Sequence, residues 1–158
     1  MAKNYSITFK SLRTGDVYTV TIGGGTGEPV ALKGGASPFV TSEDADEDMF
    51  VPIRTQSGYI RILDDGYAAD GVTAFDWKDL LVRMNTERPV TLVARPAADA
   101  PGTTVWQGFM QAQDFGSVLY GNPQEREFPV QCVLSVLGGS DINYTQTAIQ
   151  NFAYLLKQ

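Results

Sequence analysis

Residues 5–22, YSITFKSLRTGDVYTVTI, indicate the class of fold. Apolar and polar side chains alternate over residues 5–9, which is the two-residue period of a strand with one buried face. Residues 17–22 are rich in β-branched and aromatic side chains, which are frequent in strands. Residues 13–16, RTGD, form a turn signal between the two runs. We therefore expect an antiparallel β-hairpin at the N-terminus.

Similar runs predict strands along most of the remaining chain. They cover residues 29–32, 50–54, 58–63, 89–95, 103–112 and 126–137. Two segments have helical spacing instead: Phe75–Val82, a short helix, and Thr145–Lys157, an amphipathic helix. The sequence therefore predicts an α+β fold that is mainly antiparallel β, a barrel or sandwich of about seven or eight strands with a short helix and a C-terminal helix.

The length favours one main domain. A chain of 158 residues can bury a core without disulfides or metals. We expect a β-rich domain at residues 1–140 and a C-terminal amphipathic helix at residues 141–158, which packs on that domain or on a neighbouring subunit. The helix has no capping glycine after its last apolar residues, so a continuation into a longer protein is the other interpretation.

The composition is that of an ordinary globular protein, with 43% apolar and 19% charged residues. No apolar run approaches the roughly 20 residues that cross a bilayer. The N-terminus also lacks the apolar core of a signal peptide. Cys132 is the single cysteine, which excludes an internal disulfide and fits a reducing compartment. It belongs to an alternating run, residues 128–134, and we expect it to face the core.

The chain contains no histidine. This absence removes the Ser-His-Asp and Cys-His nucleophile systems, the commonest general base and nearly every catalytic zinc site. Any chemistry would have to use carboxylates, lysine or tyrosine. We therefore expect no enzyme activity, no cofactor and no metal.

Charge is unevenly distributed along the chain. Residues 1–41 have a balance of +2, residues 42–48 contribute −5, and the remainder contributes −3, for a net charge of −6. A net acidic surface repels phosphate backbones, so nucleic-acid binding is disfavoured. The acidic run, SEDADED, is followed directly by the apolar residues Met49, Phe50 and Val51.

Two motifs fail when their spacing is tested. If the acidic run began a calcium loop at Asp44, Met49 would stand where the loop requires glycine and Thr55 where it requires glutamate. Residues 22–28, IGGGTGE, follow a strand as a phosphate loop would, but no Lys-Ser/Thr and no helix start follow them. We interpret the glycine-rich stretch as the flexible tip of a hairpin. A looser divalent site in the acidic run stays open.

Two further acidic pairs could supply the two carboxylates of a glycosidase, which must lie about 5–9 Å apart. They are Asp64 with Asp65, and Glu125 with Glu127. Sequence alone does not give their separation, and surface solvation is the default interpretation of such pairs.

Several segments of the chain, in the same order and spacing, resemble tail-tip proteins of prophages in gut bacteria. They are residues 47–62 (EDMFVPIRTQSGYIRI), 75–77 (FDW), 88–92 (RPVTL), 105–109 (VWQGF) and 129–134 (PVQCVL). The resemblance covers about residues 40–140. One departure concerns residues 137–140, Leu-Gly-Gly-Ser, where such proteins have an Asp-Gly-Leu-Gly turn. We therefore assign no subfamily.

Such proteins are similar to the baseplate hub and distal tail families, whose barrel domains assemble into rings that continue the tail tube. The resemblance implies a structural component of a phage or prophage tail that acts by ring assembly and not by catalysis. It implies other tail proteins and further copies of the chain as partners, with no nucleic acid, membrane or small-molecule substrate. It also implies a location in the bacterial cytoplasm during assembly and in the virion tail afterwards.

In a ring-forming barrel, the acidic run would lie near a neighbouring subunit, where arginines bind carboxylates bidentately. The candidate assembly surface is Glu43, Asp44, Asp46, Glu47, Asp48, Arg54 and Arg61, with Arg83, Arg88 and Arg95 as further possible partners. A solvated loop is the alternative interpretation of the run. The alternative function is a free-standing β-rich binding module for a carbohydrate or protein ligand, with Tyr67, Trp77, Trp106 or Tyr120 as exposed aromatics.

Overall fold

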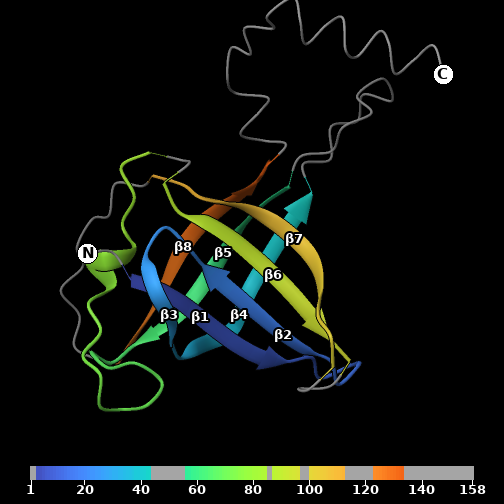
Figure 1. Cartoon of the computed structure of the whole chain (residues 1–158), viewed down its shortest axis with the longest axis horizontal. Coiled ribbons are helices and arrows are strands. Elements are labelled where there is room, and N and C mark those ends of the chain that lie inside the picture. The colour runs from blue at the N-terminus through green and yellow to red at the C-terminus, as the bar shows by residue number, and fades with distance from the viewer. Residues whose placement is uncertain (1–2, 44–55, 85–86, 97–99, 113–122, 134–158) are drawn as a thin grey trace, which may run out of the picture.

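Eight strands in the described part of the chain form one mixed sheet in a computed structural model, which describes residues 3–43, 56–84, 87–96, 100–112 and 123–133 (Figure 1). The strands are β1 (Lys3–Lys10), β2 (Val17–Ile22), β3 (Thr26–Ala31), β4 (Gly34–Glu43), β5 (Gln56–Asp64), β6 (Pro89–Arg95), β7 (Thr103–Met110) and β8 (Gln124–Cys132). Their order across the sheet is β3-β1-β2-β6-β7-β8-β5-β4. The mainly antiparallel β fold is confirmed.

The N-terminal hairpin forms as its sequence predicts. β1 and β2 pair in antiparallel register from Tyr5↔Ile22 to Lys10↔Val17. The turn is closed by the Ser11 N–H, which donates to the Asp16 carbonyl at 2.9 Å. Gly15 has φ +77°, a left-handed conformation that glycine adopts without a steric penalty.

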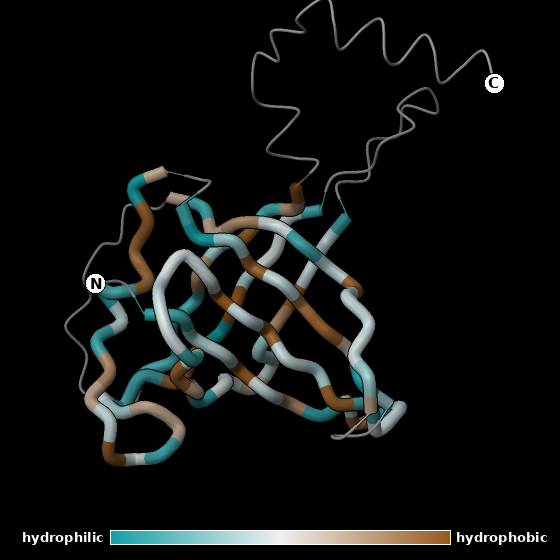
Figure 2. The backbone as a smooth tube through the Cα atoms, in the orientation of Figure 1, coloured by the Kyte–Doolittle hydropathy of each residue, from teal (hydrophilic) through white to brown (hydrophobic). Residues whose placement is uncertain are grey.

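Alternation along the strands places one face of the sheet in the core, as the banding along the tube in Figure 2 shows. On the first hairpin, Tyr5, Ile7, Val20 and Ile22 are buried, and Phe9 packs partly buried against them. The far half of the sheet contributes the other side of the same core, with Ile60, Ile62, Trp106, Phe128 and Val130. Cys132 is also buried, as its alternating run predicted.

Five other predicted strands are present. Residues 29–32, 58–63, 89–95, 103–112 and 126–137 correspond to β3, β5, β6, β7 and β8, with shifted ends. The predicted strand at residues 50–54 lies outside the described residues. β4 has no counterpart among the predicted strands, because its first five residues, GGASP, have the composition of a loop. As an edge strand, β4 tolerates a proline that a central strand would not.

The glycine-rich stretch is not the tip of a hairpin. β3 pairs in parallel with β1, on the opposite side from β2, so residues 23–25 carry the chain across the end of β1. Hydrogen bonds hold this crossing: Gly23 N–H donates to the Pro89 carbonyl at 2.8 Å, and Gly25 N–H donates to the Asn4 side chain at 2.9 Å. Sequence reasoning missed the crossing because glycine content indicates a turn without indicating its destination.

The helix predicted at Phe75–Val82 is reduced to a single 3-10 turn, η1 (Trp77–Leu80). Asp76 caps the turn by accepting the Lys78 N–H, but Leu81 already has extended backbone angles. Short helices are marginal without tertiary support, and here only Leu80 of the turn is buried. The predicted helix at Thr145–Lys157, and the domain boundary at residue 140, lie outside the described residues.

A buried arginine joins several elements of the fold. Arg88 is 5% exposed, and its guanidinium donates to the carbonyls of Lys3 at 3.0 Å, Gly23 at 3.3 Å and Asp79 at 2.6 Å. The same guanidinium lies 5.8 Å from the centroid of the Tyr5 ring. One side chain therefore ties β1, the end of β2, η1 and the start of β6 together.

Trp106 gives a first test of the core. It is 8% exposed and packs edge-to-face on Phe39, with ring centroids 5.1 Å apart. We expect Trp106→Ala to lower the free energy of unfolding by about 3–5 kcal/mol, because it removes a large buried ring. Val105, the residue before Trp106 on β7, is 53% exposed, so Val105→Ala should change stability by less than about 0.5 kcal/mol. Denaturant unfolding of both variants tests this; equal midpoints would contradict it.

Tyr5 gives a test with pH. Burial and a hydrogen bond from its hydroxyl to the Asp79 carboxylate raise the pKa of Tyr5 to about 12. Ionisation at an unfolded pKa of about 10 therefore favours the unfolded chain. The stability that the raised pKa contributes is complete below about pH 10, and up to about 3 kcal/mol of it is lost as pH rises to about 12. Tyr5→Phe lacks this group, so its unfolding free energy should fall less over the same window. Parallel falls in both proteins would contradict the assignment.

Candidate functional site

The two ends of the sheet approach each other but do not pair. β3 and β4 are its edge strands, and the two residues between them bridge the gap. Leu32 N–H donates to the Ser6 carbonyl of β1 at 2.7 Å, and the Lys33 carbonyl accepts the Leu63 N–H of β5 at 2.9 Å. The sheet is therefore held closed at one point, and beyond that point a gap remains between β1 and β4. We call this gap the seam.

On one side of the seam, β1 has an edge without a strand partner among the described residues. The pairing of β3 with β1 ends at Ser6, whose carbonyl points to this edge. Because backbone groups alternate in direction along a strand, the N–H and C=O groups of Thr8 and Lys10 point to the same edge. A strand placed in the seam would find these groups ready to pair.

On the other side, β4 bulges away from β5. Its register with β5 shifts between Gly34↔Ile62 and Phe39↔Ile60. Gly34 marks the closest approach of the two sides, since a Cβ there would lie 3.1 Å from Ile7 Cγ2 and 2.8 Å from Pro38 Cγ. The seam is therefore tight at Gly34 and opens toward Phe39.

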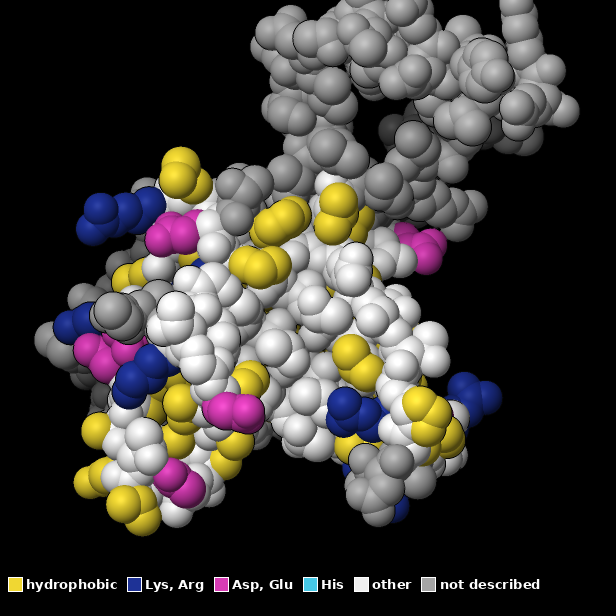
Figure 3. All heavy atoms as spheres, in the orientation of Figure 1, with side chains coloured by type: hydrophobic (Ala, Val, Ile, Leu, Met, Phe, Trp, Pro, Cys, Tyr) yellow, Lys and Arg dark blue, Asp and Glu magenta, His cyan; other side chains and the backbone are white. Residues whose placement is uncertain are grey.

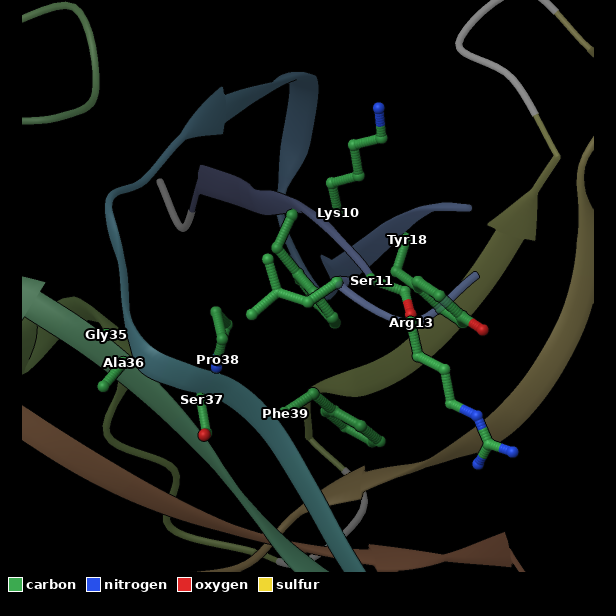
Figure 4. Close-up of a pocket in the computed structure, with 11 residues that line it drawn as sticks. Lys10, Ser11, Arg13, Tyr18, Gly35, Ala36, Ser37, Pro38 and Phe39 are labelled. Carbon is green, nitrogen blue, oxygen red and sulfur yellow. The ribbon is translucent and has the colours of Figure 1, made fainter. Parts of the chain in front are cut away.

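The opening contains a pocket of about 640 Å³ (Figure 4). It is lined by Phe9, Lys10, Ser11, Leu12, Arg13, Tyr18, Gly35, Ala36, Ser37, Pro38 and Phe39. In Figure 4, Pro38 and Phe39 from β4 lie across the hollow from Tyr18 and Arg13 of the first hairpin. Phe9 and Tyr18 stack with ring centroids 5.5 Å apart, so the floor is largely aromatic. This volume is within the range of ligand pockets, about 300–1,000 Å³.

The rim of the pocket is basic and partly apolar. Its lining includes Lys10 and Arg13 and no acidic residue. Both cations are exposed, and Leu12 between them is fully exposed. Lys10 extends away from the hollow in Figure 4, and Figure 3 shows basic side chains at the lower right corner, over the β1–β2 turn. The Glu125 carboxylate lies against Gly35 from outside this lining and accepts the Ala36 N–H at 3.2 Å.

A second cluster joins β5, β8 and η1. Arg126 Nε lies 2.6 Å from the Asp64 carboxylate, and Asp64 is 4% exposed. The other Asp64 oxygen accepts the Gly66 N–H at 3.1 Å, and the Arg126 guanidinium lies 4.3 Å from the centroid of the Trp77 ring. Each group in this cluster is engaged by another, so its geometry is that of a structural tie.

The structure places part of the predicted assembly surface. Glu43 is exposed at the end of edge strand β4, where its carboxylate accepts from Gln56 Nε2 at 3.4 Å. Arg61, which lies five residues after Gln56 on β5, pairs with Glu127 at 2.7 Å. The remaining members, Asp44, Asp46, Glu47, Asp48 and Arg54, lie outside the described residues. The assembly surface as a whole stays a prediction.

The further arginines differ in availability. Arg83 is exposed, and Arg95 is half-buried with its guanidinium 3.5 Å from the Thr19 hydroxyl. Arg88 is buried against backbone carbonyls, so it is not available to a partner's carboxylate.

The paired carboxylates that could have suggested a glycosidase each have another partner. Asp64 binds Arg126, and Lys33 lies 2.6 Å from Asp65 and holds the pKa of that carboxyl below its usual range. Glu125 accepts from the Ala36 backbone, and Glu127 binds Arg61. These contacts give each of the four carboxylates a structural partner.

The aromatic residues of the alternative binding module are dispersed. Trp106 is buried in the core, Trp77 is covered by Arg126, and Tyr67 is 49% exposed. Tyr120 lies outside the described residues. Within the described ranges, no group of three or more metal-ligating side chains is found, and no helix is long and apolar enough to cross a membrane.

Sequence reasoning missed the seam pocket. The signal that could have indicated it is the positive balance of residues 1–41, to which Lys10 and Arg13 contribute. The pocket itself needs β1 and β4 to become neighbours, and β4 was not predicted. No family model, curated protein or solved structure matches this chain.

The two ion pairs between β5 and β8 allow a matched test. We expect Asp64→Asn to lower stability by about 3–5 kcal/mol, because it leaves Arg126 partly buried without its counter-charge. Glu127→Gln breaks the exposed pair with Arg61 on the same two strands and should cost at most about 1 kcal/mol. Thermal unfolding of both variants at neutral pH checks the order. A larger loss for Glu127→Gln would contradict it.

Proposed function

We propose that the chain is a structural component of a phage or prophage tail, of the baseplate hub or distal tail kind, and that it acts by ring assembly and not by catalysis. The main observation in support of this proposal combines the sequence with the structure. The described parts of the segments that resemble tail-tip proteins lie in β5, at the start of η1, and in β6, β7 and β8. In the sheet, β6, β7, β8 and β5 are consecutive neighbours, so segments far apart in the sequence make one continuous surface.

One of these segments has a clear physical reason for its pattern. In residues 105–109, VWQGF, a Cβ on Gly108 would collide with the Trp106 ring and with the Gln131 carbonyl of β8. Glycine therefore lets the tryptophan lie over β7 while β8 pairs closely with it, at Gly108↔Cys132. The packing of the sheet therefore requires the glycine of this segment.

The edges of the sheet support assembly. Within the described part of the chain, β3 and β4 are edge strands, and β1 has an unpaired edge along the seam. Natural proteins usually cover or charge such edges, because they pair with other chains. Here β4 ends in Glu43 at the start of the acidic run. Repulsion between the acidic runs of two copies deters unselective pairing of their edges, but the run can still bind a surface of opposite charge on a neighbour.

The test is the mass of the protein in solution. We expect sedimentation velocity over a concentration series to show a cooperative change from monomer to one closed oligomer, because head-to-tail contacts close into rings. Electron microscopy of the heavier species should show rings. A free-standing binding module would sediment as a monomer, so a well-folded monomer at every concentration would contradict the proposal.

A further inference from the structure

We propose that the seam pocket receives residues 43–51 of a second copy of this chain, with the carboxylates of that segment on Lys10 and Arg13 and its apolar end in the hollow. The inference rests on the self-association proposed above and names the two surfaces that meet. The seam is the receptor surface, defined by β1 residues 8–10, the β1–β2 turn and β4 residues 35–39.

The composition of the segment matches that of the pocket in two respects. Residues 43–48 carry five carboxylates, and Met49, Phe50 and Val51 follow them directly. The pocket combines a basic rim with a floor of aromatic and apolar side chains from Phe9, Tyr18 and Phe39. A purely acidic ligand would leave the floor uncovered, and a purely apolar ligand would leave the cations unmatched. An acidic run that ends in apolar residues satisfies both.

The backbone of the seam offers a third match. The groups of Thr8 and Lys10 that point away from β2 have no strand partner among the described residues, so an extended segment can pair with them. Addition of a strand to such an edge supplies main-chain hydrogen bonds, and pockets for side chains supply the specificity. The tight contact at Gly34 and Ile7 limits the open length of the seam, so a short segment fits better than a long strand.

The contact is assigned to a second copy because it joins different parts of the surface. The segment leaves the sheet at the end of β4, whereas the receptor cations lie at the β1–β2 turn, and Figure 1 shows these two places at different corners of the sheet. A patch that binds a different patch on an identical neighbour is a heterologous contact, which propagates around a ring until it closes.

Charge-reversal variants test the contact. K10E/R13E reverses the receptor cations, and D44K/D46K/D48K reverses the segment. We expect each to weaken self-association about tenfold or more, as charge pairs at interfaces do when one side is reversed. K3E/K78E is the matched control: both side chains are exposed elsewhere, and the net charge changes by the same amount as in K10E/R13E. Its association constant should stay within about threefold of the original, and unchanged melting of all variants confirms folding.

Mixing separates contact between copies from contact within one chain. K10E/R13E retains a normal acidic segment, and D44K/D46K/D48K retains a normal seam. Their mixture should therefore associate although neither protein does so alone, because the acidic segment of the first meets the basic seam of the second. If both variants fail alone and the mixture also stays monomeric, the segment does not dock on a second copy and the inference is overturned.

A peptide provides an independent measurement. A synthetic peptide of residues 41–53, TSEDADEDMFVPI, in excess should dissociate the oligomer of the original protein, and a scrambled peptide should not. If K10E/R13E associates as K3E/K78E does, the seam is not the receptor, although self-association stands. If the original protein never associates, the proposed function fails first, and sedimentation alone reports that outcome.

Discussion

The architecture depends on one constraint: in the part of the chain that the structure describes, an eight-stranded sheet curls until its two ends meet, and backbone hydrogen bonds of two successive residues join them. Leu32 bonds to β1 and Lys33 bonds to β5, and the edge strands on either side do not pair with each other. The inner face is thereby sealed well enough to bury Ile7 and Ile62 completely. The same incomplete closure leaves the seam, with its unpaired edge and its pocket. Core and candidate site are two consequences of one geometry.

Two arginine side chains add further links between elements of the fold. Arg88 gathers carbonyls from β1, from the end of β2 and from η1, and Arg126 ties β8 to β5 while stacking on Trp77. Both guanidiniums have partners within the chain, because a buried charge is tolerated only when its donors are hydrogen-bonded. Lys10 and Arg13, at the surface of the first hairpin, are exposed and within reach of a partner.

This distribution of charge relates the acidic run to the rest of the molecule. Arg61, Arg88 and Arg126 bind other groups of the chain, so a general attraction to arginine explains little about the run. The seam pocket has a basic rim and an aromatic floor. The sequence from Glu43 onward changes from acidic to apolar residues, which match the rim and the floor respectively. Assembly through the seam would give both features one role, in keeping with the tail-tip resemblance of residues 40–140.

The sequence by itself determined the β class, the first hairpin, five further strands and the inward position of Cys132, because these depend on local period and side-chain type. Tertiary structure decided what depends on neighbours distant in the chain. It made GGASP the start of an edge strand, turned the glycine-rich stretch into a crossing to parallel β3, and reduced the helix at Trp77 to one turn. The pocket belongs to the second group, since it exists only where β1 and β4 come together, and no local pattern encodes which edges of a curled sheet will meet.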